Sequence, residues 1–108
     1  MLRIGESPAP YRDWKWTPAG MFVGGPNFIM LPDHSLIVSG RQLNPSPTGA
    51  KTFIGRMDAT SITPQLILPS GGDTSYPGLV WHKNQVWVSY YSSHEGKTGI
   101  YLAKVKFD

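Results

Sequence analysis

The stretch Gly71-Gly72-Asp73-Thr74-Ser75-Tyr76-Pro77 decides the fold of this chain, because a shorter copy of it, Gly24-Gly25-Pro26, occurs earlier. The sequence after each copy also matches, as an apolar segment, a polar turn and a second apolar segment. After the earlier copy these are residues 28–31, 32–34 and 36–39. After the later copy they are residues 79–81, 82–84 and 86–89. The chain therefore contains two copies of a strand-turn-strand unit, about 50 residues apart.

The composition and the repeat together favour strands over helices. Twelve Gly and ten Pro among 108 residues interrupt any helix longer than a few turns. No stretch shows apolar residues at helical spacing over three turns. A strand-and-turn repeat of this period is typical of propeller blades, in which four antiparallel strands, A to D, run from the centre outward. The sequence therefore predicts an all-β fold with two four-stranded antiparallel blades in a single partial-propeller domain.

The predicted strands divide the chain into three parts. The complete blade, residues 21–70, has its strands near 27–31, 35–41, 51–57 and 63–68. The last blade, residues 71–108, has only the inner three strands, near 77–82, 85–91 and 98–106. Residues 1–20 are predicted to be the C and D strands of a preceding blade. This follows because residues 2–5 resemble 52–55 and residues 11–16 alternate in the manner of a strand.

Two blades leave apolar flanks and strand edges open. We expect the N-terminal strand at residues 11–16 to complete the last blade, either within the chain or from a neighbouring copy. Residues 2–5 and residues 99–105 are then both candidates for the C strand of the last blade. We expect the longer segment, residues 99–105, to occupy that position. Three copies would close a six-bladed ring by head-to-tail contacts. The predicted partner is therefore the chain itself, as a homotrimer.

Charge and cysteine content bound the partners and the chemistry. Ten Lys and Arg against seven Asp and Glu give a net charge of +3, scattered without a run, so no nucleic-acid partner is predicted. The chain has no Cys, which excludes disulfides and thiolate metal sites, and no cofactor is predicted. The N-terminus lacks the apolar core of a signal peptide, and no apolar run could span a bilayer. We therefore expect no membrane association and a cytoplasmic protein as expressed, with its natural location left open.

The propeller interpretation predicts where the functional loops lie. The D-to-A and B-to-C loops of a propeller share one face, and the A-to-B turns lie on the other. Four loops should therefore converge on a single face, at residues 24–27, 41–50, 71–76 and 92–97. Nearly all side chains with chemical interest lie in these loops, which makes this face the candidate site.

Two segments of the C-terminal half resemble a known family. The first is residues 68–82, Leu-Pro-Ser-Gly-Gly-Asp-Thr-Ser-Tyr-Pro-Gly-Leu-Val-Trp-His. The second is residues 88–98, Val-Ser-Tyr-Tyr-Ser-Ser-His-Glu-Gly-Lys-Thr, continued by Ile100-Tyr101-Leu102-Ala103. Both are similar to the last blade of bacterial sialidase-like (BNR-type) six-bladed β-propellers. The resemblance extends to Gly24-Gly25-Pro26-Asn27-Phe28 and to Trp14-Lys15-Trp16, so the chain looks like the C-terminal two blades of such a protein.

The resemblance implies candidate catalytic residues. Sialidases carry an arginine cluster for the substrate carboxylate, a Tyr nucleophile paired with Glu, and an Asp acid/base. Tyr76, at the start of an inner strand, matches the nucleophile, Glu95 is its candidate partner, and Asp73 is the candidate acid/base. Tyr76 and Asp73 also have structural alternatives, since Tyr76 could pack at the channel mouth and Asp73 could bond its own turn.

Four further residues are candidate ligand-binding groups: Arg41, Asn27, Thr74 and His94. Arg41 ends a predicted strand, and a guanidinium pairs bidentately with a carboxylate, although an internal ion pair is the structural alternative. Thr74 is also a turn residue. His94 and Glu95 are adjacent on one loop, which is a weak set of metal ligands, so no metal site is predicted.

The catalytic set is incomplete in this sequence. The acid/base Asp and the remaining arginines of sialidases belong to earlier blades, and the family's Ser-x-Asp-x-Gly-x-x-Trp box does not occur here. We therefore expect a propeller module that is non-catalytic alone and binds carbohydrate or an anionic ligand at the loop face. The first alternative is a sialidase-like glycoside hydrolase, as a fragment or with its site rebuilt by oligomerisation. The second is a protein-interaction scaffold.

Overall fold

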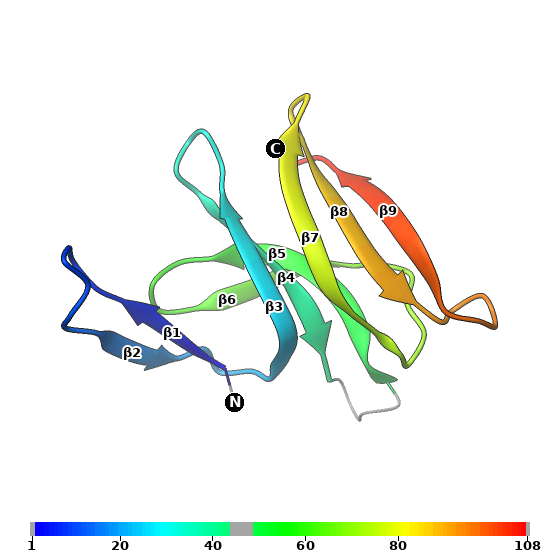
Figure 1. Cartoon of the computed structure of the whole chain (residues 1–108), viewed down its shortest axis with the longest axis horizontal. Helices are drawn as coiled ribbons and strands as arrows, with labels where there is room; N and C mark the ends of the chain where they lie inside the picture. Colours follow the sequence, from blue (N-terminus) through cyan, green and yellow to red (C-terminus); the bar gives the residue numbers. More distant parts are fainter. Residues whose placement is uncertain (1, 44–48, 108) are drawn as a thin grey trace.

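The computed structural model describes residues 2–43 and 49–107. These residues form nine β-strands in three antiparallel sheets and no α-helix (Figure 1). The N-terminal sheet contains β1 (Arg3–Glu6) and β2 (Lys15–Pro18). The central sheet contains, in order, β3 (Val23–Met30), β4 (Leu36–Gln42), β5 (Lys51–Met57) and β6 (Ile62–Ile67). The C-terminal sheet contains β7 (Thr74–His82), β8 (Gln85–Ser92) and β9 (Gly99–Val105).

The central and C-terminal sheets share one strand register. Leu36 of β4 opposes Met57 of β5, and the equivalent residue Val86 of β8 opposes Val105 of β9. The match continues without a shift to the other end of both strand pairs, where Gln42 opposes Lys51 and Ser92 opposes Gly99. The repeat expected from the sequence is therefore a repeat of structure, residue by residue, over these strands.

A β-bulge occurs at the same place in β3 and β7. The register shifts between Gly24 and Asn27 in β3 and between Ser75 and Gly78 in β7. The residue before the proline of each bulge has a positive φ, 53° at Gly25 and 52° at Tyr76. Gly24-Gly25-Pro26 is therefore equivalent to Ser75-Tyr76-Pro77. The sequence alignment of Gly24-Gly25 with Gly71-Gly72 is wrong, because the bulge of the second copy comes later in the chain and has a Tyr at the left-handed position.

The N-terminal sheet corresponds to the outer two strands of the central sheet. Ala19 N donates to Leu2 O at 3.0 Å, and Leu68 N donates to Thr52 O at 2.9 Å in the same relation to β5 and β6. This equivalence agrees with the expected similarity of residues 2–5 to 52–55. The strand predicted at residues 11–16 begins later, as β2, and pairs with β1. Residues 11–16 therefore do not complete the C-terminal sheet, and the outer edge of β9 has no partner strand in the described part of the chain.

Each sheet has two faces, because side chains alternate along a strand. In the central sheet, one face contains the side chains of Phe28, Val38 and Phe53, and we call it the leading face. The opposite face contains Ile29, Ile37 and Ile54, and we call it the trailing face. The leading face of the central sheet packs against Leu2 and Ile4 of the N-terminal sheet and its flanking residues. Its trailing face packs against the C-terminal sheet.

The larger core lies between the central and C-terminal sheets. It combines trailing-face residues of the central sheet with the leading face of the C-terminal sheet, which contains Leu79, Val88 and Tyr90. Ile37, Ile54 and Val88 are fully buried. A fully buried aliphatic side chain contributes about 1.5–3 kcal/mol to folding, so these three residues make a large contribution to stability.

The all-β prediction is confirmed, and the strands other than β2 lie close to their predicted positions. β3 and β7 begin earlier than expected because each continues through its bulge. The three sheets do not close into a ring (Figure 1). Within residues 2–43 and 49–107, the structure contains no helix of the length and hydrophobicity that a membrane span requires.

Candidate functional site at one end of the sheets

The described parts of the four predicted loops meet at one end of the sheets. Gly25 lies against Ser75 and Tyr76, and on the other side Gly71 lies against Ser93 and the backbone of His94. The β3–β4 and β7–β8 turns lie at the opposite end (Figure 1). Part of the predicted loop at residues 41–50, namely residues 44–48, lies outside the described residues. The loop that contains Asp73 therefore lies between the bulge of β3 and the β8–β9 turn.

Arg41 lies near the end of β4, opposite Gly24 of β3 and Thr52 of β5. Its guanidinium fills the space beside Gly24, because a Cβ placed on that glycine would lie 2.9 Å from Arg41 Nη2. Arg41 Nε is buried and has no hydrogen-bond partner among the described residues. A buried donor left unpaired costs about 1–3 kcal/mol. Because Nε is buried, an acceptor from outside the chain can approach only the terminal nitrogens of the guanidinium.

Tyr76 forms the exposed aromatic surface of the site. It is 73% exposed, although it lies in a strand, because the bulge turns its side chain outward. Its ring stacks on Tyr91 of β8, with ring centroids 6.2 Å apart and an interplanar angle of 29°. Ser75, the preceding residue, donates from its hydroxyl to Gly24 O at 3.2 Å and fixes β7 to β3. The two stacked phenols therefore lie on a backbone that is fixed across two sheets.

Tyr91 connects Arg41, Asp73 and Tyr76. Burial raises the pKa of Tyr91, and the carboxylate of Asp73 raises it further, whereas the positive charge of Arg41 opposes the rise. Tyr76 adds a smaller contribution in the upward direction. A raised pKa keeps the Tyr91 phenol protonated at neutral pH. Tyr91 therefore remains a neutral hydroxyl within a group that contains one cation and one anion.

A network of buried hydroxyl groups holds together the strand ends next to the loop-face residues. Thr74 is fully buried, and its hydroxyl donates to Tyr91 O at 2.7 Å while pairing with Thr52 Oγ1 at 2.6 Å. Ser70 Oγ donates to Leu68 O at 2.6 Å and accepts from Thr52 N at 3.0 Å. Thr74, a candidate for ligand binding, is thus placed inside the core, where its hydroxyl has a structural role.

His94 and Glu95 form a second group on the β8–β9 turn. His94 Nδ1 lies 2.9 Å from Ser92 Oγ, and its ring lies 4.4 Å from the ring of Tyr101 between centroids. Tyr101 donates its phenolic hydrogen to Glu95 Oε1 at 2.6 Å, and this hydrogen bond raises the pKa of Tyr101. Glu95 is therefore partnered by Tyr101 of β9. It does not form the Tyr–Glu pair with Tyr76 that the resemblance implies.

Asn27, the remaining candidate, connects the two bulges. Its Nδ2 donates to Pro77 O at 3.0 Å, and its Oδ1 accepts from Phe28 N at 2.9 Å. Both ends of the amide are engaged, so Asn27 acts here as a clasp between β3 and β7. No group of three or more His, Cys, Asp or Glu side chains gathers around one point among the described residues.

Sequence reasoning missed Tyr91 and Tyr101, the two tyrosines around which the candidates gather. A signal for Tyr91 is present, because the shared strand register makes it the equivalent of Arg41. For Tyr101 the only sequence signal is its position on β9 next to the turn that contains Glu95. The Arg41, Asp73, Tyr76 and Tyr91 group, which we call the loop-face site, offers a guanidinium, a carboxylate and a stacked aromatic surface. These groups can bind a polar ring that has an acidic substituent.

The chain was also compared with known proteins. No family model, no curated protein and no solved structure matches it.

Proposed function

We propose that this chain is a non-catalytic ligand-binding module of the β-propeller type, and that the loop-face site binds a sugar with a carboxylate. The observation that carries the proposal is the Arg41 guanidinium, whose buried Nε lacks a partner among the described residues. A guanidinium fork matches the geometry of a carboxylate and forms two parallel charge-assisted hydrogen bonds with it.

The neighbouring groups suit the rest of such a ligand. The exposed ring of Tyr76, backed by Tyr91, offers an apolar surface for one face of a pyranose. The Asp73 carboxylate lies close enough to raise the pKa of Tyr91, and it can accept hydrogen bonds from sugar hydroxyls. The binding of Glu95 to Tyr101 favours recognition over hydrolysis, because it occupies the group that a Tyr nucleophile requires.

The proposal includes a fold of propeller blades completed by self-assembly. The identical register of β4–β5 and β8–β9, and the head-to-tail stacking of the sheets, support this interpretation. With two blades per chain, three copies close a six-bladed ring, so that three loop-face sites surround one channel. The resemblance to sialidase-like propellers agrees with six blades.

The ligand is tested by titration calorimetry with N-acetylneuraminic acid and with N-acetylglucosamine, a neutral sugar. We expect binding of the acidic sugar only. Arg41→Gln should weaken it about ten- to a hundredfold, which corresponds to the loss of a charged hydrogen bond of about 1.5–3 kcal/mol. Arg12→Gln removes the same charge from an exposed position outside the loop-face site and should leave the affinity unchanged. Tyr76→Phe, which keeps the ring, should preserve binding, and Tyr76→Ala should not.

Three other results would contradict the proposal. Turnover of a fluorogenic sialoside that Tyr76→Phe abolishes would assign the chain to the sialidase-like hydrolases. The absence of both binding and turnover would leave a protein-interaction scaffold. Equal loss of affinity in Arg41→Gln and Arg12→Gln would show that the sugar binds by general charge and not at the loop-face site.

A further inference from the structure

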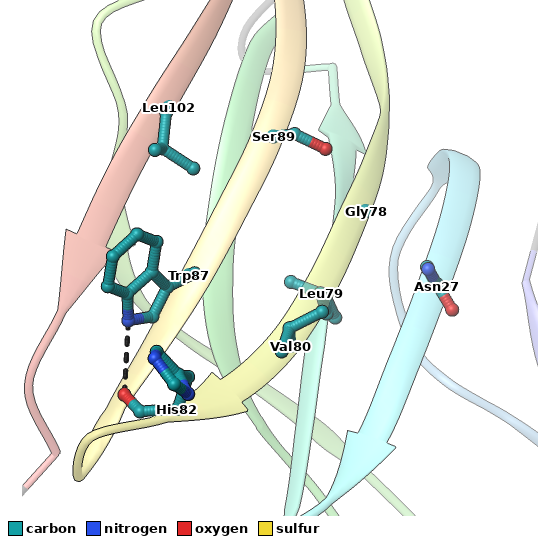
Figure 2. A pocket seen from close by; sticks show the side chains of 8 residues that line it. All are labelled: Asn27, Gly78, Leu79, Val80, His82, Trp87, Ser89 and Leu102. Carbon is teal, nitrogen blue, oxygen red and sulfur yellow. Dashed lines mark hydrogen bonds between the residues drawn. The ribbon is translucent and has the colours of Figure 1, made fainter.

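No other described sheet covers the trailing face of the C-terminal sheet, which is mostly apolar apart from Lys104, whose Nζ lies over the Trp87 ring at 4.5 Å from its centroid. Val80 and Leu102 are each 59% exposed there, on either side of Trp87. These side chains line an open groove of about 510 Å³ (Figure 2). The Trp87 indole is held in place by its Nε1 hydrogen bond to His82 O at 3.0 Å. A fixed aromatic ring at the centre of an apolar groove is the form that protein-binding surfaces take.

The equivalent face in the central sheet is already covered within the chain. The shared register makes Val80, Trp87 and Leu102 the equivalents of Ile29, Ile37 and Ile54. Those three residues belong to the core that the leading face of the C-terminal sheet covers. The groove therefore lies on the second copy of a trailing face. In the first copy this face packs against the leading face of another sheet of the same type.

A matching leading face is free at the other end of the chain. Phe28 is 56% exposed and Met30 is 62% exposed, although their equivalents on β7, Leu79 and Trp81, pack in the core. The reason is that the N-terminal sheet has only two strands, which correspond to β5 and β6. It covers the outer part of the leading face and leaves β3 open.

The free edge of β9 also has a matching strand at the other end of the molecule. In the central sheet, β5 is flanked by β6, with Ile54 opposite Leu66. β2 is the equivalent of β6, and Thr17 opposes Ile4 of β1 as Leu66 opposes Ile54. The strand that β9 lacks is therefore present in the chain, but β2 and β9 lie at opposite sides of the molecule (Figure 1).

We propose that a second copy of this chain docks on the groove, with Phe28 and Met30 against Val80 and Trp87, and that its β2 pairs with β9. In this exchange β9 replaces β1 of the incoming copy, because Leu102 and Ile4 occupy equivalent positions. The replacement is favourable because β9 has seven residues and β1 has four. The inference rests on the blade assembly proposed above and names the two surfaces and the strand that make it.

The register of the exchange makes the test specific. Leu102 of one copy should lie directly opposite Thr17 of the next, where Cα atoms are about 4.5–5.5 Å apart. This separation lies within the disulfide range of about 4.4–6.8 Å. The chain has no native Cys, so single substitutions give clean probes. A mixture of the Thr17→Cys and Leu102→Cys variants should form disulfide-linked heterodimers under mild oxidation, as read on non-reducing gels.

Leu66→Cys is the matched control. Leu66 is the equivalent of Thr17 on the central sheet and is 44% exposed. Its strand, β6, already pairs with β5 of the same chain, so it is not available to pair with β9 of another copy. We expect several-fold more heterodimer from the Thr17 and Leu102 pair than from the Leu66 and Leu102 pair. Equal yields would overturn the proposed exchange.

Light scattering on the wild-type chain separates the inference from the assembly on which it rests. A mass near three times 11.9 kDa without the specific disulfide would keep the ring and reject the exchanged strand. A mass of 11.9 kDa at every concentration, without the disulfide, would reject both. Formation of the specific disulfide, at either mass, supports the pairing of β2 with β9 and the two surfaces beside it. Sugar binding is measured independently, so its failure leaves the interface intact.

Discussion

Tyr76 and Gly25 share a backbone conformation that glycine adopts freely and tyrosine does not. Their φ angles are 52° and 53° at equivalent points of two bulges. A left-handed residue with a Cβ costs about 1–2 kcal/mol. Such strain tends to persist where a side chain has a task. Here it places the Tyr76 ring outward, beside Tyr91 and above Gly25.

This strain predicts that, at position 76, a glycine variant is more stable than an alanine variant, which is the reverse of the usual order in a strand. Glycine in a strand is normally less stable than alanine by about 0.5–1 kcal/mol. At position 76 we expect Tyr76→Gly to be more stable than Tyr76→Ala by about 1 kcal/mol, because both lose the ring and only alanine keeps a Cβ at positive φ. Urea unfolding of both variants measures the difference. The pair Val80→Gly and Val80→Ala on the same strand should show the normal order, and a normal order at position 76 would contradict the strain.

At the scale of elements, the buried Thr52 and Thr74 pair joins β5 of one sheet to β7 of the next. Thr74→Val keeps the shape but leaves Thr52 Oγ1 and Tyr91 O without this partner. We expect a loss of about 1–3 kcal/mol in unfolding free energy. The double variant Thr52→Val and Thr74→Val should lose less than the sum of the single variants, because two facing hydroxyls are replaced by two facing methyls. Additive losses in the double-mutant cycle would mean that the two hydroxyls do not interact.

The strands could be predicted from the sequence because burial imposes a visible pattern. Val86-Trp87-Val88-Ser89 follows Leu36-Ile37-Val38-Ser39 so closely that β4 and β8 were expected at nearly their observed bounds. The position of the second bulge was not predictable in this way. Each of these two bulges contains a residue with positive φ, and in the second copy that residue is Tyr76, whereas glycine is the ordinary sequence sign of that conformation.

The candidate site could be predicted only in part, because sequence spacing places loops but not partners. Arg41, Asp73 and Tyr76 come together around Tyr91. Thr74 and Asn27 hold strands together, and Glu95 bonds with Tyr101. Asn27, Thr74 and Glu95 differ from the first three candidates in the direction of the side chain. That direction depends on strand register and bulge position, neither of which a single sequence specifies.

At the scale of the whole molecule, the proposed assembly predicts that stability depends on concentration. Binding between native copies stabilises the folded state by mass action, so the Tm should rise by several degrees as the wild-type concentration increases. Leu102→Lys should remove this rise, because it introduces a charge into the groove. It should leave the Tm of the dilute chain nearly unchanged, since Leu102 is 59% exposed. Differential scanning fluorimetry over a dilution series measures both, and a concentration-independent wild-type Tm would oppose the assembly.

The order of the sheets gives the molecule a direction. One end has a partly open leading face at β3, and the other end has an open trailing face at β8 and β9. A unit with two unlike, complementary ends polymerises head to tail, as a filament does, until its curvature brings the last end to the first. In the proposed assembly, the angle between the central and C-terminal sheets therefore sets the number of copies that close the ring. If three units complete the circle, growth stops at a soluble particle, and a change that flattens this angle would convert the same chain into a fibre.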